Sequence, residues 1–425
     1  MVSGKNRSVC NRRPYQVTGG KTCCGRLEHL ETVVTPAANS RSGPVQDKSE
    51  DLSARWNSVV RRRAFLKGIG VAGALIPTGG LLAASVKAAG TNKAPARVAG
   101  RLTAGDAAIL RFLTAAEIIE TDLWQQYNEI GGVNGGNPSY MAALSNLDGD
   151  MPQYISDNTD DEESHAAFLN AYLASRGAEQ VNLDEFRILP SSKATGARQV
   201  RRLTNLQNLV VDTSFYTRYR SSENPDLGDS PAQAVNIVNE PAIPLNDTET
   251  PPGIDQPVPP TSNEARRMQA IANTAGFHFG YIEQGGASLY ATLALKVRDL
   301  EVLRIVLSIG GVEIDHFGLW HDKMGNAVSQ PLAGVVDPKT GVTFPDLNAK
   351  NSELSQTNLI LPEPTDFLAG LPEVSIIRPT LAEKAGAVAT IKSFTADLLF
   401  DGQTPEFFKT VMELAEAADA AQRGF

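Results

Sequence analysis

The sequence of 425 residues is poor in cysteine and histidine, and it contains few signals for β-strands. Its three cysteines, Cys10, Cys23 and Cys24, all lie near the N-terminus. Disulfides, zinc–thiolate sites and iron–sulfur clusters all need cysteine sulfur, so the remainder of the chain cannot form any of them. Hydrophobic residues make up 42% of the sequence, so a large buried core is available, and disorder or a collagen-like fold is excluded.

Basic residues are scarce in the body of the chain. Residues 1–67 carry 13 Lys and Arg against 5 Asp and Glu, whereas residues 68–425 carry 26 against 43. Affinity for a phosphate backbone comes mainly from Lys and Arg, so we expect no nucleic-acid partner for this acidic body. The basic N-terminal end needs a separate explanation.

An arginine-rich run precedes a short apolar segment near the N-terminus. Residues 61–67 read RRRAFLK, residues 68–84 are uncharged and rich in Gly and Ala, and small residues follow at 85–90. This order resembles a twin-arginine signal peptide, and the apolar segment is too short and too rich in Gly and Pro to span a membrane as a stable helix. The resemblance implies a signal at 61–90, cleavage near Ala88, passage through the twin-arginine translocation machinery, and a periplasmic or secreted product. The alternative is a short basic loop before a buried helix.

Residues 1–60 are polar and aperiodic, and they lie upstream of where such signals normally begin. We predict that they are a disordered leader or a wrongly assigned start. No Met lies between Met1 and Met141, so a shorter product would begin at a non-Met codon near Val59 or Val60. The twin-arginine route carries folded proteins, often with a cofactor already inserted, which favours a metal or redox cofactor.

Apolar residues recur at helical spacing through most of the remaining chain. The pattern predicts helices over 103–130, 151–176, 198–220, 263–296, 300–325, 382–399 and 405–423, with a shorter segment after Asn137-Pro138. Dense Pro, Gly, Asn and Asp predict long loops at 221–260 and 326–375, the second with a small hairpin at 335–344. The predicted fold is all-α, with a bundle at 100–325, a long crossover at 178–262 between its second and third helices, and a loop and C-terminal helical extension at 326–425.

Two of the five histidines lie in a Glu-x-x-His motif, at Glu162–His165 and Glu313–His316. Chance would give about 0.3 such matches. The i, i+3 spacing places carboxylate and imidazole on one helix face, close enough to bind neighbouring metal ions. Each motif is preceded by a predicted helix with a glutamate among apolar residues, and a tyrosine follows that glutamate seven positions later. These pairs are Glu120 with Tyr127 and Glu283 with Tyr290.

This doubled arrangement, over 103–177 and 263–325, resembles the ferritin-like superfamily, which includes bacterioferritin, rubrerythrin and manganese catalase. The resemblance implies a four-helix bundle that binds two iron or manganese ions at its centre. The ligands that it implies are Glu120, Glu162, His165, Glu283, Glu313 and His316. Four carboxylates balance two divalent cations, and mixed oxygen and nitrogen ligation suits iron or manganese.

Two sets of positions have alternative interpretations. Glu117 lies one turn before Glu120 on nearly the same helix face, and it is an alternative ligand with Trp124 in place of the tyrosine. Tyr127 and Tyr290 are either core residues with one hydrogen bond or partners that orient the ligand carboxylates.

Other polar residues near the motifs are expected to lie outside the ligand set. Glu163 stands two positions before His165 and would point away from the site. Asp315 is expected to be solvated or to contact a ligand, and His278 and His321 are expected to be ordinary polar helix residues. A bundle that binds no metal is the alternative to the whole set.

The chain also departs from the family pattern. An acidic run at 157–163 is consistent with a motif near a helix start, and Gly285-Gly286 costs roughly 1–2 kcal/mol of helix propensity. The glycine pair indicates a close helix contact, a local bulge or access for a small molecule. A crossover of this length and a C-terminal extension argue against a closed storage shell.

The first hypothesis for function is an exported di-metal oxidoreductase that acts on peroxide or O2. The second is a non-enzymatic protein of the cell envelope that binds metal or has a stress-related structural role, and the third is a metal-free helical interaction module. A homo-oligomer is compatible with each hypothesis.

Overall fold

The computed structural model describes residues 100–214, 233–327, 333–347, 362, 370–374 and 385–424. The proposed leader and twin-arginine signal, residues 1–90, lie outside the described residues. The last part of the helix predicted for 198–220 lies outside them as well.

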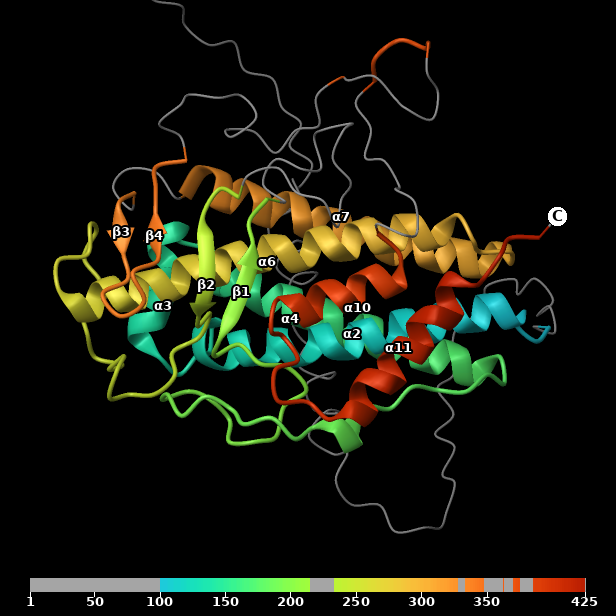
Figure 1. Cartoon of the computed structure of the whole chain (residues 1–425), viewed down its shortest axis with the longest axis horizontal. Coiled ribbons are helices and arrows are strands. Elements are labelled where there is room, and N and C mark those ends of the chain that lie inside the picture. The colour runs from blue at the N-terminus through green and yellow to red at the C-terminus, as the bar shows by residue number, and fades with distance from the viewer. Residues whose placement is uncertain are drawn as a thin grey trace, which may run out of the picture. The chain divides into compact units, whose positions relative to one another are not determined.

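Four long helices form the bundle: α2 (Ala104–Gly131), α4 (Met151–Ser175), α6 (Asn263–Ala294) and α7 (Leu300–Ala327). α2 packs along α4, and α6 packs along α7 (Figure 1). Side-chain caps start α2 and α6, because Thr103 accepts from the Asp106 amide and Ser262 accepts from the Ala265 amide. The prediction of an all-α bundle with a long crossover between its second and third long helices is confirmed.

Short elements fill the connections. α3 (Pro138–Leu147) joins α2 to α4, and the crossover contains a 3-10 turn and one antiparallel pair of strands. The turn is Asp184–Phe186, and the strands are β1 (Leu209–Asp212) and β2 (Asn236–Glu240). The hairpin predicted for 335–344 is present as β3 (Val335–Val336) and β4 (Thr343–Phe344).

The helix predicted for 198–220 is wrong over its described part. Residues 198–208 are irregular, and β1 follows them. Buried Asp122 of α2 accepts the backbone N–H groups of Leu203 and Thr204, both at 2.9 Å, which satisfies them without a helix. The adjacent Val210 and Val211 are β-branched and pair with β2. Tertiary contacts therefore override an apolar spacing that suited a helix.

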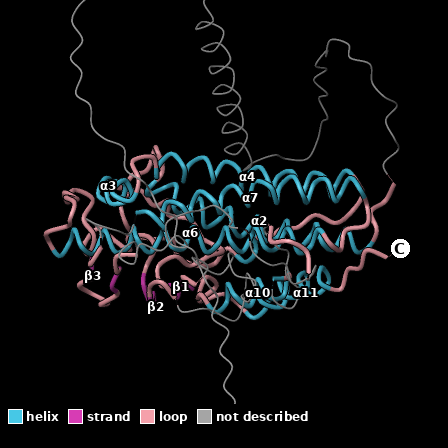
Figure 2. Tube along the Cα trace, turned by 90° about the horizontal axis from the view of Figure 1, so that it is seen from above, coloured by secondary structure: helices cyan, strands magenta, loops and turns pink. Residues whose placement is uncertain are grey.

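The helices are arranged in layers, which Figure 2 shows from above. α10 (Ala387–Ala396) and α11 (Pro405–Asp419) lie against the α2 and α6 layer, and α4 and α7 lie on the opposite side of it. The C-terminal helices thus cover the α2/α6 side of the bundle, and none of the described helices covers the outer side of α4 and α7.

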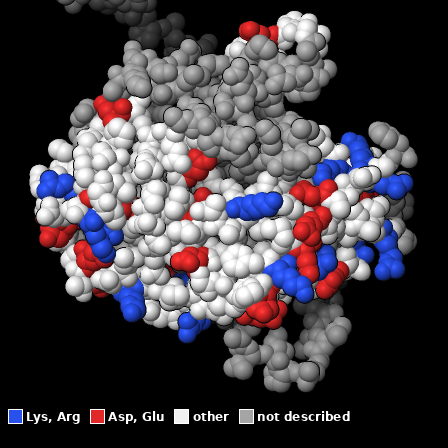
Figure 3. All heavy atoms as spheres, viewed as in Figure 1, with Lys and Arg blue, Asp and Glu red and all other residues white. Residues whose placement is uncertain are grey.

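Two further properties concern the surface and the helices. Lys and Arg are interspersed with Asp and Glu over the described part of the face in Figure 3, so that face has no field of a single sign. None of the helices in the described part of the chain combines the length and apolar character that a membrane span requires.

Candidate metal centre

All four long helices contribute buried acidic or imidazole side chains to one region of the bundle. Within it, two groups of four residues each bring their ligand atoms within 4.8 Å of one another. The first group is Glu117, Glu162, His165 and Glu313. The second group is Glu162, Glu283, Glu313 and His316. Glu162 and Glu313 belong to both groups, so the two sites are adjacent and share two carboxylates.

The two histidines face the shared carboxylates through their Nδ1 atoms. His165 Nδ1 lies 3.2 Å from Glu162 Oε2, 3.3 Å from Glu117 Oε2 and 3.4 Å from Glu313 Oε1. His316 Nδ1 lies 3.1 Å from Glu162 Oε1 and 3.3 Å from Glu283 Oε2. The ring centroids are 6.4 Å apart. Each Glu-x-x-His motif therefore supplies one carboxylate that both sites share and one imidazole for its own site.

Five of the six sequence-predicted ligands belong to these groups, and Glu120 does not. Glu117, the alternative ligand, contributes from α2 in its place. Glu120 lies close by and is buried, and burial followed by the charges of Glu313 and Glu162 raises its pKa well above the usual value. No metal assignment follows from proximity alone, so the ligand set stays a prediction.

The carboxyl groups differ sharply in acidity. Burial and the neighbouring Glu162 charge raise the pKa of Glu117 to about 8. Burial also raises the pKa of Glu313 well above its usual value. Burial opposes ionisation of Glu162 as well, but hydrogen bonds with His165 and His316 lower its pKa to about 2. The arrangement is therefore consistent with a carboxylate at Glu162 and protons held by its neighbours.

The donor atoms fit a pair of divalent cations. Among the described residues, Glu117 Oε2, Glu283 Oε2 and both oxygens of Glu313 are buried and accept no hydrogen bond, and three of them have only a histidine Nδ1 at 3.3 to 3.4 Å. Buried carboxylate oxygens without partners are costly, and a bound cation satisfies them. Each metal ion would displace protons from these groups, because ligands bind in their deprotonated forms. Oxygen and imidazole donors without thiolate suit iron or manganese.

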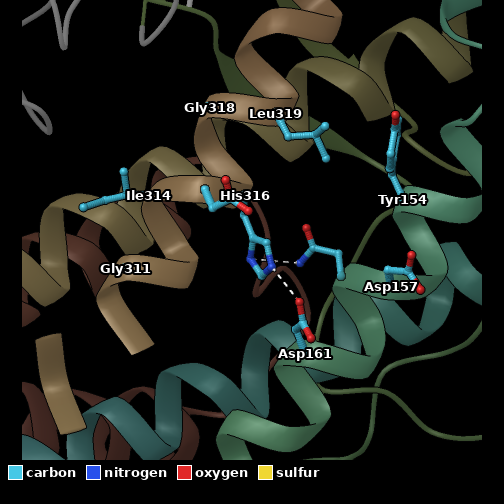
Figure 4. A pocket seen from close by; sticks show the side chains of 10 residues that line it. Tyr154, Asp157, Asp161, Gly311, Ile314, His316, Gly318 and Leu319 are labelled. Atoms are coloured by element: carbon cyan, nitrogen blue, oxygen red, sulfur yellow. Dashed lines mark hydrogen bonds and ion pairs between the residues drawn. The ribbon is translucent and has the colours of Figure 1, made fainter. Parts of the chain in front are cut away.

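The His316 end has a supporting shell that the sequence argument missed. The Asn158 amide donates to Glu162 Oε1 at 2.9 Å and to Glu283 Oε1 at 3.0 Å. Trp320 Nε1 in turn donates to Asn158 Oδ1 at 2.8 Å. Asp161 Oδ2 lies 3.2 Å from His316 Nε2, as Figure 4 shows. Such outer contacts fix the orientation of a ligand imidazole.

A sequence signal existed for part of this shell. Asn158 and Asp161 stand four positions and one position before Glu162, so Asn158 lies on the ligand face of α4. The acidic run at 157–163 lies in the middle of α4, not at its start. Trp320 was not foreseeable by spacing within its own helix, because its role depends on contact between α7 and α4.

Gly286 leaves room for a ligand carboxylate. A Cβ atom built at this position would lie 2.5 Å from Glu313 Oε2. At Gly285, by contrast, such an atom meets nothing within 4 Å. Of the three readings of the glycine pair, close helix contact therefore applies at Gly286, where α6 and α7 bring a backbone against a buried carboxylate.

The two tyrosines of the repeated pattern have different partners. Tyr290 OH donates to Glu117 Oε1, so it contacts the site. Tyr127 OH and His278 Nδ1 share a hydrogen bond of 2.7 Å, and burial lowers the pKa of His278 to about 3. His278 is therefore a neutral imidazole in the core. His321 is buried too, and neither of these histidines belongs to the metal-ligating groups.

Two cavities reach the site between α4 and α7. One of about 610 Å³ has His316, Asp157 and Asp161 in its lining (Figure 4), together with Asp315. The other, of about 590 Å³, ends at His165. Both are lined by residues of α4 and α7 and include a histidine of the site, so small molecules have routes to the buried groups.

The fold and the site define a class: a four-helix bundle with a buried carboxylate and histidine cluster at its centre, compatible with metal binding. A family model described as a ferritin-like domain matches residues 105–326, which is just over half of the chain. The protein therefore belongs to the ferritin-like family. No curated protein and no solved structure gave a significant match to the chain.

Proposed function

We propose that the protein is an exported metalloprotein with a dinuclear iron or manganese centre that performs redox chemistry on peroxide or O2. The observation that carries this proposal is the sharing of Glu162 and Glu313 between two adjacent groups. Two carboxylates common to both groups hold two metal ions at short range, which is the arrangement of di-metal carboxylate bundles.

In the proposed centre, Glu117 and His165 would hold one ion, Glu283 and His316 would hold the other, and Glu162 and Glu313 would be available to both. When bound, such a metal pair exchanges two electrons with peroxide or O2. The protein's own groups hold and orient the ions. The Tyr290 hydroxyl fixes the Glu117 carboxylate, and the Asp161 carboxylate fixes the tautomer of His316.

Metal content measured by plasma mass spectrometry tests the centre. We expect about two iron or manganese ions per chain in protein purified from an exporting host, and nearly none in a Glu162→Ala/Glu313→Ala variant. A Glu163→Ala variant is the matched control, because Glu163 is exposed and donates no atom to either group. Far less than one ion per chain in the native protein after reconstitution would overturn the proposal.

A second pair of variants decides between the two candidate ligands on α2. We expect Glu117→Gln to lower metal content to about one ion per chain, because only the His165 group contains this residue. Glu120→Gln should retain both ions. The opposite result would restore Glu120 as the ligand.

Turnover assays then test the chemistry. Catalase and ferroxidase activity in the metal-loaded protein, lost in the Glu162→Ala/Glu313→Ala variant, would support redox function. Stoichiometric metal without turnover of peroxide or O2 would instead indicate a non-enzymatic metal-binding protein. Export is tested separately, by cell fractionation of the native chain against an Arg62→Lys/Arg63→Lys variant, which should remain in the cytoplasm.

A further inference from the structure

The cavity at His165 is larger and more apolar than a site for peroxide or O2 needs to be. Its walls include Phe168 of α4 and Ile305, Ile309 and Val312 of α7, and the buried His165 is also in its lining. A volume of about 590 Å³ is typical of a site for a small organic molecule and far larger than peroxide needs. The walls therefore suit an apolar body.

The mouth of this cavity is apolar as well. The Phe168 side chain is 52% exposed, and its ring stacks on Tyr172 at a centroid distance of 6.4 Å. Leu300 and Leu307 of α7 do not line the cavity, but each is next in sequence to a lining residue, and they are exposed by 76% and 57%. An exposed aromatic side chain in the lining of a cavity is typical of a binding site for an apolar ligand.

One uncompensated cation lies in the lining. Arg304 has no ion pair with any carboxylate in the described part of the chain. The nearby Glu301 is paired with Arg176 at 3.1 Å. The mouth thus combines apolar walls with an available guanidinium group, which binds carboxylate or another oxyanion well.

We propose that this cavity binds an amphiphilic organic anion, with its head group at Arg304 and its apolar chain directed along Ile305, Ile309 and Val312 toward His165. Arg304 and Val312 are eight residues apart on α7, or roughly 12 Å along the helix axis, which suits a medium-length alkyl chain. Binding of this ligand depends only on the cavity and needs no metal. The role of the ligand as a substrate rests on the metal centre proposed above.

Calorimetric titration of the full-length protein with decanoate, decanol and decylammonium tests the proposal. We expect decanoate to bind most tightly, decanol more weakly and decylammonium most weakly. Arg304→Gln should weaken decanoate binding by about three- to tenfold and leave decanol unchanged, because a rim ion pair is worth about 1 kcal/mol. Phosphatidylglycerol vesicles should not displace decanoate, which separates a free amphiphile from a lipid surface.

A matched pair of tryptophan variants locates the site. Ser308 lines the cavity, whereas Leu307 is exposed beside it and does not line it. Ser308→Trp should abolish decanoate and decanol binding, and Leu307→Trp should retain both, with unchanged melting temperatures showing that each variant folds. Equal binding in the two variants, no saturable binding to native protein, or equal affinity for decylammonium would overturn the proposal.

Metal content measured on the same samples separates this proposal from the previous one. Decanoate binding by a chain that takes up no metal would leave the pocket in place and refute the dinuclear centre. Two metal ions per chain without decanoate binding would do the reverse.

Discussion

The His165 end and the His316 end of the site are built from the same sequence pattern but have different surroundings. At the His316 end, Asn158, Asp161 and Trp320 form a hydrogen-bonded shell, and the adjoining cavity has several acidic lining residues. At the His165 end, Tyr290 contacts Glu117, and the adjoining cavity is mostly apolar. The repeat thus reproduces the metal-ligating groups. The neighbouring residues make one adjoining cavity acidic and the other mostly apolar.

The largest expected effect is on metal content, and it comes from replacing a carboxylate that the two ends share. Glu313→Gln removes an anionic ligand from both groups, whereas Glu283→Gln removes one from the His316 group only. We expect Glu313→Gln to lose both metal ions and Glu283→Gln to keep about one ion, on the His165 side. Metal content after dialysis against a weak chelator measures the difference. Equal losses in the two variants would show that the ends do not act as separate sites.

The next effect concerns Gly286, which accommodates Glu313. Alanine at this position would place a methyl group 2.5 Å from the present position of Glu313 Oε2, so the carboxylate must move. The end of a flexible side chain moves easily, so the fold should survive while metal affinity falls by roughly one hundredfold. Titration with a competing chelator measures this change.

The adjacent glycine supplies the control. Gly285→Ala meets no atom within 4 Å, so it should leave metal affinity unchanged and raise stability by about 1 kcal/mol through helix propensity. A fall in affinity with this variant too would mean that the helix backbone, and not the space beside Glu313, determines the result.

These differences between the ends also show what was predictable from the sequence. Residues whose roles follow from spacing on one helix, such as Glu162 with His165 and Glu313 with His316, were brought together as expected. The choice between Glu117 and Glu120 depends on the rotation of α2 relative to the other three helices, which the one-turn spacing within α2 leaves open. The strand β1 escaped prediction for a similar reason, since buried Asp122 satisfies the backbone N–H groups just before it.

A smaller effect on metal affinity is expected at the two tyrosines, which occupy equivalent positions in the repeat. Tyr290→Phe removes the hydrogen bond to Glu117, and we expect metal affinity to fall by about tenfold. Tyr127→Phe leaves His278 Nδ1 without its donor, so it should cost about 1–2 kcal/mol of stability and leave metal affinity unchanged. Chelator competition measures metal affinity and urea unfolding measures stability in both variants. Equal changes of both quantities in the two variants would contradict the prediction.

The smallest expected effect is an acid sensitivity that arises at His278, in the core away from both metal-ligating groups. Burial lowers its pKa from 6.5 to about 3, so the unfolded chain binds an additional proton between these values. The stability that this group contributes is fully present above pH 6.5 and is lost as the pH falls through this window, by at most about 1.4 kcal/mol for each pH unit. His278→Gln keeps an acceptor for Tyr127 but does not titrate. Its urea midpoint should therefore fall less steeply between pH 6.5 and pH 4 than that of the native protein, and parallel curves would show that His278 is not the group responsible.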